Sequence, residues 1–136
     1  MPTATAQALV NFRAGLPGFP DEHEFVLAHE GDEDSPFWIL QSSADPKVAF
    51  VLVVPFAFFP DYDFELDDAG AERIGIVDPS DALVFSVVTL ADRAEDSTVN
   101  LLAPVVVNRH SGEALQHVLS KGYDVKTPIV RNSRRA

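Results

Sequence analysis

The sequence predicts an all-β protein, folded as one antiparallel domain that is barrel-like or sandwich-like and carries one short helix. Three observations predict this fold class. Apolar and β-branched segments recur at intervals of about 8 to 12 residues. Turn-forming residues separate them, and only one segment has the pattern of a helix. Because 136 residues suffice for one core and are few for two, we expect one domain over residues 1–130 and a basic, disordered tail over residues 131–136.

Four strands are expected in the first part of the chain, at residues 9–12, 25–29, 37–41 and 48–54. The segment Gly15–Pro20 is expected to turn, and residues 30–36 are polar and turn-rich, which is typical of an exposed connection. The fourth strand is apolar at every position. We therefore expect it to be covered on both faces, either at the centre of a sheet or in a barrel wall backed by other chain.

The stretch from Pro55 to Leu66 is the centre of the functional prediction. It reads PFAFFPDYDFEL and places five aromatic residues among three carboxylates. Its second half alternates apolar and acidic side chains, which is the period of a half-buried strand. The apolar set is Tyr62, Phe64 and Leu66, and the acidic set is Asp61, Asp63 and Glu65. We expect one face of this strand to enter the core and the other to suit a basic, partly apolar protein partner.

One helix is expected, over residues 68–74. Asp67 or Asp68 can accept hydrogen bonds from the free N–H groups at its start, and Gly75 is typical of the residue that ends a helix. The following Asp78-Pro79-Ser80-Asp81 is typical of a type I turn. Further strands are then expected at residues 82–90, 97–102, 104–108 and 113–119, with a last segment over residues 123–130. Pro104, where the strand at residues 97–102 gives way to the strand at residues 104–108, has no backbone N–H and predicts a bulge or an edge there.

Charge is the strongest compositional signal. The chain has 21 acidic and 10 basic residues, a net charge of -11, and 19 of the acids but only 4 of the bases lie in residues 1–107. Such a field repels phosphate backbones and speeds encounter with basic partners, so we expect no direct nucleic-acid binding. Charge alone is equally consistent with a surface that keeps the protein soluble. The absence of cysteine, of a signal-peptide pattern and of a long apolar run predicts a cytoplasmic protein without a membrane segment.

No standard catalytic or metal-binding motif is present, so we expect no enzyme activity, cofactor or metal. His29 and His117 fall in strand-like segments, where packing is the expected role, and residues 32–34 lack the spacing of a calcium loop. One alternative stays open. If Asp61 and Asp63 share a strand face about 6 to 7 Å apart, they approach the geometry of a glycosidase pair, and the domain could be a small carbohydrate-active or ligand-binding barrel.

Several motifs, taken in order over residues 12–129, resemble the flagellar assembly factor FliW family. They are Gly15-Leu16-Pro17-Gly18-Phe19, Pro36-Phe37-Trp38-Ile39-Leu40-Gln41-Ser42, the apolar run Ala49–Val54, Phe58-Phe59-Pro60-Asp61-Tyr62, Asn100-Leu101-Leu102-Ala103-Pro104 with Val105-Val106-Val107-Asn108, and Thr127-Pro128-Ile129. Each motif is weak alone, whereas the ordered set is specific. Residues 109–126 depart from the family's pattern.

The resemblance implies a barrel-like, non-enzymatic protein that works by binding other proteins. Proteins of this family bind the translational repressor CsrA (carbon storage regulator) and antagonise it, and they also bind flagellin, so that flagellin synthesis is coupled to export. Antagonism non-competitive with RNA is the expectation. We expect partner contacts at Phe58, Phe59, Asp61, Tyr62, Asp63, Asn100, Leu101 and Leu102. Among the aromatic residues, Tyr62 and Phe64 are expected to pack mainly in the core.

Overall fold

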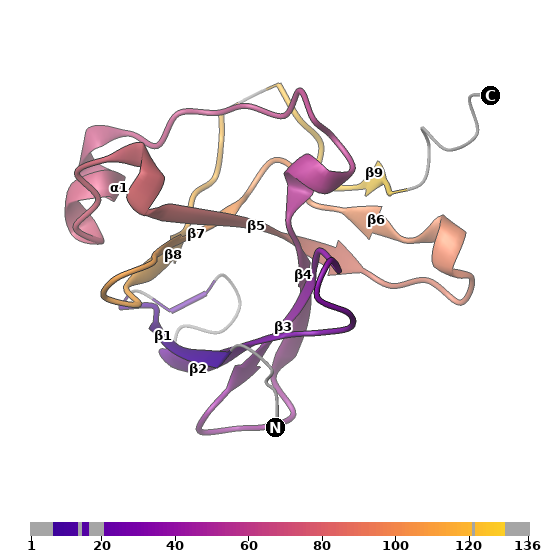
Figure 1. The fold of residues 1–136 in the computed structure, drawn as a ribbon, viewed down its shortest axis with the longest axis horizontal. Coiled ribbons are helices and arrows are strands. Elements are labelled where there is room, and N and C mark those ends of the chain that lie inside the picture. Colours follow the sequence, from indigo (N-terminus) through magenta and orange to yellow (C-terminus); the bar gives the residue numbers. More distant parts are fainter. Residues whose placement is uncertain (1–6, 14, 17–20, 121, 130–136) are drawn as a thin grey trace.

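The expected all-β class with one short helix is confirmed by the computed structural model, which describes residues 7–13, 15–16, 21–120 and 122–129 (Figure 1). Nine strands form one antiparallel network in this part of the chain. The strands are β1 (Gln7–Asn11), β2 (Glu24–His29), β3 (Phe37–Ser42), β4 (Ala49–Val53), β5 (Ala82–Thr89), β6 (Thr98–Val99), β7 (Val105–Asn108), β8 (Ala114–Gln116) and β9 (Thr127–Pro128). The expected turn at Gly15–Pro20 lies partly outside the described residues, and the expected tail lies wholly outside them.

Strand β5 joins two parts of the sheet. Its first half pairs with β7, with Leu83 opposite Val107, and its second half pairs with β4 and β6, with Val88 opposite both Val51 and Val99. Strands β1 to β4 form an antiparallel meander that leads into β5. Beyond β5 the sheet continues with β6, which pairs in turn with β9. The sheet therefore curls around a core, and the chain has the barrel-like form that the sequence predicts (Figure 1).

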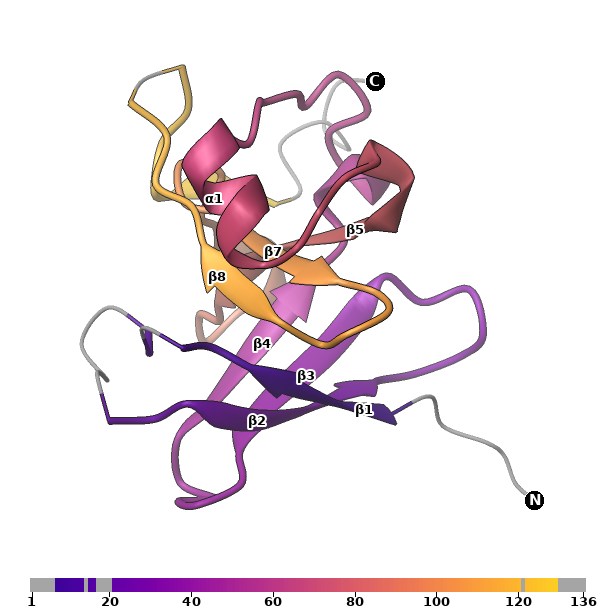
Figure 2. The same ribbon diagram turned by 90° about the vertical axis from the view of Figure 1, so that its left-hand side faces the viewer.

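The curled sheet nearly returns to its first strand. Strand β8 pairs with β7, and a single parallel bridge between Asn11 and Glu113 brings β1 beside the start of β8 (Figure 2). The backbone N–H of Asn11 also donates to the carbonyl oxygen of Gly112 at 2.8 Å. Because no ladder joins β1 to β8 among the described residues, the sheet is not closed.

Two hydrophobic clusters lie on opposite faces of β4. Leu52 belongs to the first cluster, with Phe12, Phe25 and Phe85, whereas the adjacent Val53 belongs to the second. Successive side chains of a strand point to opposite faces, so a strand between two cores must be apolar throughout. The expectation of a doubly covered fourth strand is confirmed. The second cluster contains Val53, Phe59, Tyr62, Val88, Val99, Leu101 and Ile129.

The prediction of a strand over residues 61–66 is wrong. Pro55 instead begins a 3₁₀ helix, η1 (Pro55–Ala57), and the N–H of Phe59 returns to the carbonyl oxygen of Pro55 at 2.8 Å. A further turn follows, in which the N–H of Tyr62 donates to the Phe59 carbonyl oxygen at 2.9 Å. The alternation of burial nevertheless holds, because Tyr62 is buried while its acidic neighbours are exposed. The segment has no ladder partner.

Three other expected strands are shorter than predicted. Only Thr98–Val99 of residues 97–102 forms a strand, because the Asn100 side chain accepts hydrogen bonds from the N–H groups of Leu102 and Ala103, both at 3.0 Å. This is a local turn that competes with the ladder. Strand β8 covers the middle of residues 113–119, and β9 covers two residues of 123–130.

The expected helix is confirmed as α1 (Asp68–Arg73). Asp67 is its N-cap and accepts a hydrogen bond from the N–H of Gly70 at 2.7 Å. Gly75 follows the helix with a φ of 72°. The turn at residues 78–81 is a 3₁₀ helix, η2 (Pro79–Asp81), and η3 (Ala94–Asp96) lies in the connection between β5 and β6. Within the described residues, no helix combines the length and apolarity needed to cross a membrane.

Candidate protein-binding surface

Tyr62 fixes the aromatic segment, residues 55–66, to the body of the protein. Its hydroxyl group donates a hydrogen bond to the carbonyl oxygen of Leu101 at 2.7 Å, and its ring packs edge-on against Tyr123 with a centroid separation of 4.7 Å. Tyr123 holds the next residue, because its hydroxyl group accepts from the N–H of Asp63 and donates to the Asp63 carbonyl oxygen, both at 3.0 Å. Burial, and then the neighbouring Tyr123, raise the pKa of Tyr62 above its ordinary value of 10.0.

This hydrogen bond brings together the two segments that the sequence indicates separately. Residues 58–63 and 100–102 are far apart in the chain, yet the Tyr62 side chain joins them directly. Three of the eight predicted contact residues are buried in the second cluster: Phe59, Tyr62 and Leu101. Phe58, Asn100 and Leu102 are half-buried, and Asp61 and Asp63 are exposed. The accessible part of the predicted site is therefore two carboxylates beside partly covered apolar and amide groups.

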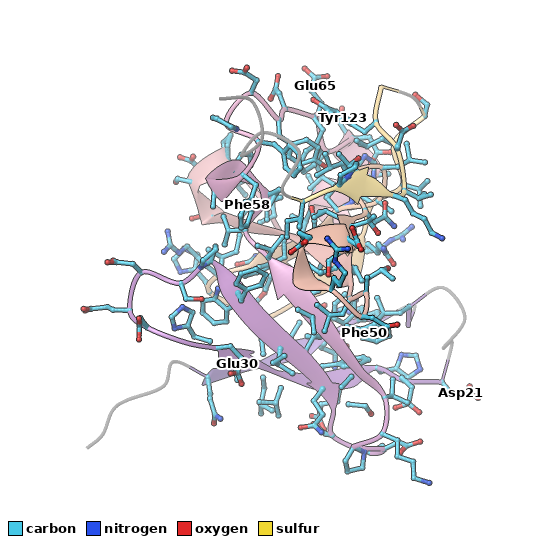
Figure 3. The ribbon with its side chains drawn as sticks, turned by 90° about the vertical axis from the view of Figure 1, so that its right-hand side faces the viewer. Asp21, Glu30, Phe50, Phe58, Glu65 and Tyr123 are labelled. Atoms are coloured by element: carbon cyan, nitrogen blue, oxygen red, sulfur yellow. The ribbon has the colours of Figure 1, made fainter. Side chains whose placement is uncertain are left out.

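The candidate surface lies at one end of the molecule. In Figure 3, Phe58, Glu65 and Tyr123 lie toward the upper end, and Glu30 lies toward the opposite end. The ring of Phe58 packs 6.0 Å from that of Phe37, between centroids, which holds it against β3. Asp61 and Asp63 flank Tyr62 in the chain, so the ring packing and the hydrogen bond of Tyr62 set where the two carboxylates lie.

An apolar groove beside this surface is a feature that sequence reasoning missed. It encloses about 680 Å³. Its lining residues are Phe56, Asp63, Phe64, Glu65, Leu66, Asp68, Ala71, Ile76, Val77, Pro79, Ala82, Val84 and Val106. They come from the aromatic segment, α1, the connection between α1 and η2, η2 itself, β5 and β7, so only the folded chain assembles them. Two of its apolar side chains are exposed in the structure, Phe56 at 42% and Val77 at 93%.

The arrangement of the carboxylates does not support the carbohydrate-active alternative. Asp61 and Asp63 do not lie on a strand, so the shared strand face on which that alternative depends is absent. Only Asp63 of the two lines the groove. Within the described ranges, no group of three or more His, Asp or Glu side chains is placed to hold a metal ion. His29 is packed instead: its Nε2 lies 2.7 Å from the Ser35 carbonyl oxygen, and its ring lies 4.9 Å from that of Trp38.

Comparison with known proteins identifies the family. The FliW protein family matches residues 2–129 of the chain. The flagellar assembly factor FliW of Bacillus subtilis (strain 168) is 43% identical over 124 residues, which cover 90% of this chain and 86% of that protein. The FliW of Desulfitobacterium hafniense (strain DSM 10664 / DCB-2) is 44% identical over 118 residues, covering 86% of this chain and 76% of that protein.

A solved structure agrees with these sequence relatives. The crystal structure of a flagellar assembly factor FliW superposes with a TM-score of 0.82 and 38% sequence identity, covering 89% of this chain and 84% of the other. The family match extends over nearly the whole chain and includes every strand described above. The chain therefore belongs to the FliW family of flagellar assembly factors.

Proposed function

We propose that this chain is a cytoplasmic, non-enzymatic regulator of flagellar assembly that binds CsrA and flagellin. It antagonises CsrA without competing for the RNA site, and its binding of flagellin couples flagellin synthesis to export. The observation that carries the proposal is the Tyr62–Leu101 hydrogen bond of 2.7 Å. It gathers Asp61, Asp63 and the 100–102 segment into one accessible, acidic and partly apolar surface, which suits a basic protein partner.

The net charge of the chain supports a protein partner over a nucleic acid. The net charge of -11 repels phosphate and favours rapid encounter with basic surfaces. An acidic protein that antagonises an RNA-binding repressor acts directly on that repressor, since it has no means of holding the RNA. Asp61 and Asp63 are exposed, so they are available to such a partner without any rearrangement of the core.

Shared surface explains why the two partners exclude each other. A stable complex buries about 800 Å² on each partner, and a domain with a total accessible surface of 8286 Å² has few sites that combine apolar and acidic groups. We expect CsrA and flagellin to overlap on the surface around Asp61 and Asp63. Exclusion then requires no conformational change in the barrel-like domain.

The test of exclusion is a titration of flagellin into the preformed complex with CsrA, followed by size-exclusion chromatography. The expected result is release of free CsrA as the complex with flagellin forms. A stable ternary complex, with flagellin affinity unchanged by CsrA, would move flagellin to another face. Failure of the chain to bind either protein would reject the proposed function itself.

The mode of antagonism is tested at saturating RNA. We expect an excess of the chain to weaken RNA binding by CsrA through a coupling free energy of about 1 to 3 kcal/mol, with a plateau that added RNA does not remove. An inhibition curve that added RNA shifts without limit would instead indicate direct competition for the RNA site.

A further inference from the structure

The apolar groove is a candidate binding site separate from the exposed carboxylate of Asp61. Its volume of about 680 Å³ lies within the range of about 300 to 1,000 Å³ that is usual for sites occupied by a ligand. Val77, at 93% exposed, and Phe56, at 42%, present apolar surface at this groove. Single exposed apolar residues are ordinary, but a pair that lines one concave surface is typical of an interaction site.

The groove presents side chains to its occupant. Val84 of β5 and Val106 of β7 line it, and they pair with each other in the sheet. Ten of the thirteen lining residues are apolar, so an occupant is recognised chiefly through its own apolar side chains. An amphipathic helix that lays its apolar face into a groove is the peptide form that binds in this way.

The charge of the groove restricts its occupant further. Asp63, Glu65 and Asp68 are exposed and line it, and every ionisable residue that lines it in the described part of the chain is acidic. An acidic helix would meet like charges, whereas lysine or arginine beside the apolar face would pair with these carboxylates. Charge complementarity of this kind sets both orientation and association rate.

We infer that the groove between the aromatic segment, α1 and β5 binds an amphipathic helical segment of a partner protein that carries lysine or arginine beside its apolar face. This inference rests on the proposed function in one respect, because it gives the protein-binding surface a second recognition element and a defined partner chemistry. Asp63 lies on both the exposed acidic surface and the groove, so one partner can contact the two together.

The test uses a synthetic peptide of about 15 residues, which is long enough to form a helix on binding. It contains only leucine and lysine, with leucines on one helical face. A scrambled peptide of the same composition is the control for charge alone. Fluorescence anisotropy should give saturable binding of the patterned peptide, at least about tenfold tighter than the scrambled one. Equal binding of both peptides would show attraction by net charge only and would overturn the inference.

Matched variants locate the binding. Phe56→Ser with Val77→Ser should weaken patterned-peptide binding by about tenfold, since both residues line the groove. Leu90→Ser with Val118→Ser removes two exposed apolar side chains that do not line the groove and should leave the affinity unchanged. Glu65→Gln should weaken binding more at low salt than Glu30→Gln, which removes the same charge at the opposite end of the molecule (Figure 3). Melting temperatures confirm that the variants are folded.

Other occupants give distinct results. If sedimentation shows that the wild-type chain self-associates and the groove variant does not, a second copy occupies the groove and the inference is overturned. If removal of residues 131–136 strengthens peptide binding tenfold or more, the chain's own basic end is the occupant, with the same consequence. If the groove variant loses the peptide yet binds CsrA and flagellin as the wild type does, the groove is not part of their interface and the proposed function stands alone.

Discussion

The hydroxyl group of Tyr62 donates a hydrogen bond to the backbone carbonyl oxygen of Leu101, 2.7 Å away and 39 residues later in the sequence. Both residues are buried in the second hydrophobic cluster, together with Val53 of β4. The bond therefore ties an irregular segment, which has no ladder partner, to the turn that follows β6. Stability of the aromatic segment and geometry of the candidate surface depend on the same contact.

Replacement of Tyr62 by phenylalanine tests this contact. Tyr62→Phe keeps the ring and leaves the buried carbonyl oxygen of Leu101 without its partner, so the free energy of unfolding should fall by about 1 to 3 kcal/mol. Urea denaturation measures the loss. Tyr123→Phe is the control, because its hydroxyl group bonds the exposed Asp63 backbone and should matter less. An equal loss in both variants would show that burial of the Tyr62 bond adds nothing.

The raised pKa of Tyr62 predicts a dependence of stability on pH. The unfolded chain releases the tyrosine proton near pH 10, while burial makes the folded chain retain it. Above about pH 10 the folded state thus binds more protons than the unfolded state, and the free energy of unfolding must fall as pH rises. Urea midpoints from about pH 8 to about pH 11 should fall more steeply in the wild type than in Tyr62→Phe. Equal slopes of urea midpoint against pH in the two proteins would show that Tyr62 does not cause the loss of stability.

The parts of the fold that the sequence predicts well are those governed by local pattern. The uniformly apolar run at β4 indicates burial on both faces, and Leu52 and Val53 indeed enter different clusters. Helix α1 is recognised from Asp67 and Gly75, because capping depends on residues within one turn of the helix end.

The parts that the sequence does not predict depend on contacts distant in the chain. Alternation at residues 61–66 gives the correct burial but not the missing ladder, since pairing requires a neighbouring strand that no local pattern reveals. Asn100 ends β6 early through its side-chain hydrogen bonds. The candidate site shows the same limit. Exposure of Asp61 was predictable from the sequence, whereas neither the burial of Leu101 beside Tyr62 nor the existence of the groove was.

Gly112 is expected to be essential where β8 approaches β1. Its φ is 82°, and a Cβ atom there would lie 2.6 Å from the carbonyl oxygen of Leu9. Gly112→Ala combines backbone strain with a clash against main chain and should cost about 2 to 4 kcal/mol of unfolding free energy. Gly75→Ala is the matched control. Its φ is 72° but its nearest contact is Asn108 Nδ2 at 3.5 Å, so only the strain of about 1 to 2 kcal/mol is expected.

Thermal unfolding of the two variants separates these effects. Strain alone should lower both melting temperatures by similar amounts, and the additional loss in Gly112→Ala measures the clash with β1. Hydrogen exchange of the Asn11 amide, which bonds the Gly112 carbonyl oxygen at 2.8 Å, should also accelerate in that variant only. Equal losses would mean that the approach of β8 to β1 relaxes at no cost.

Asn108 connects the end of α1 to the end of β7. Its Nδ2 donates to the carbonyl oxygens of Ile74 at 2.8 Å and Gly75 at 3.2 Å, and its Oδ1 accepts from the N–H of His110 at 2.9 Å. Asn108→Asp keeps the acceptor but turns a buried carboxylate oxygen toward two carbonyl oxygens. The expected loss is about 2 to 4 kcal/mol, measured by urea denaturation at neutral pH. A loss below about 1 kcal/mol would show that this junction is open to water.

Charge reversal tests whether the acidic surface guides binding. Asp61 and Asp63 are exposed, so Asp61→Lys with Asp63→Lys should preserve the fold and slow association with CsrA by roughly tenfold at low ionic strength. The difference from the wild type should shrink as salt is added, because screening removes long-range attraction. Asp32→Lys with Asp34→Lys makes the same change in net charge in the exposed 30–36 connection. It should slow association far less, and stopped-flow rates that are equal for the two double variants would show that net charge, and not the surface around Tyr62, sets the rate.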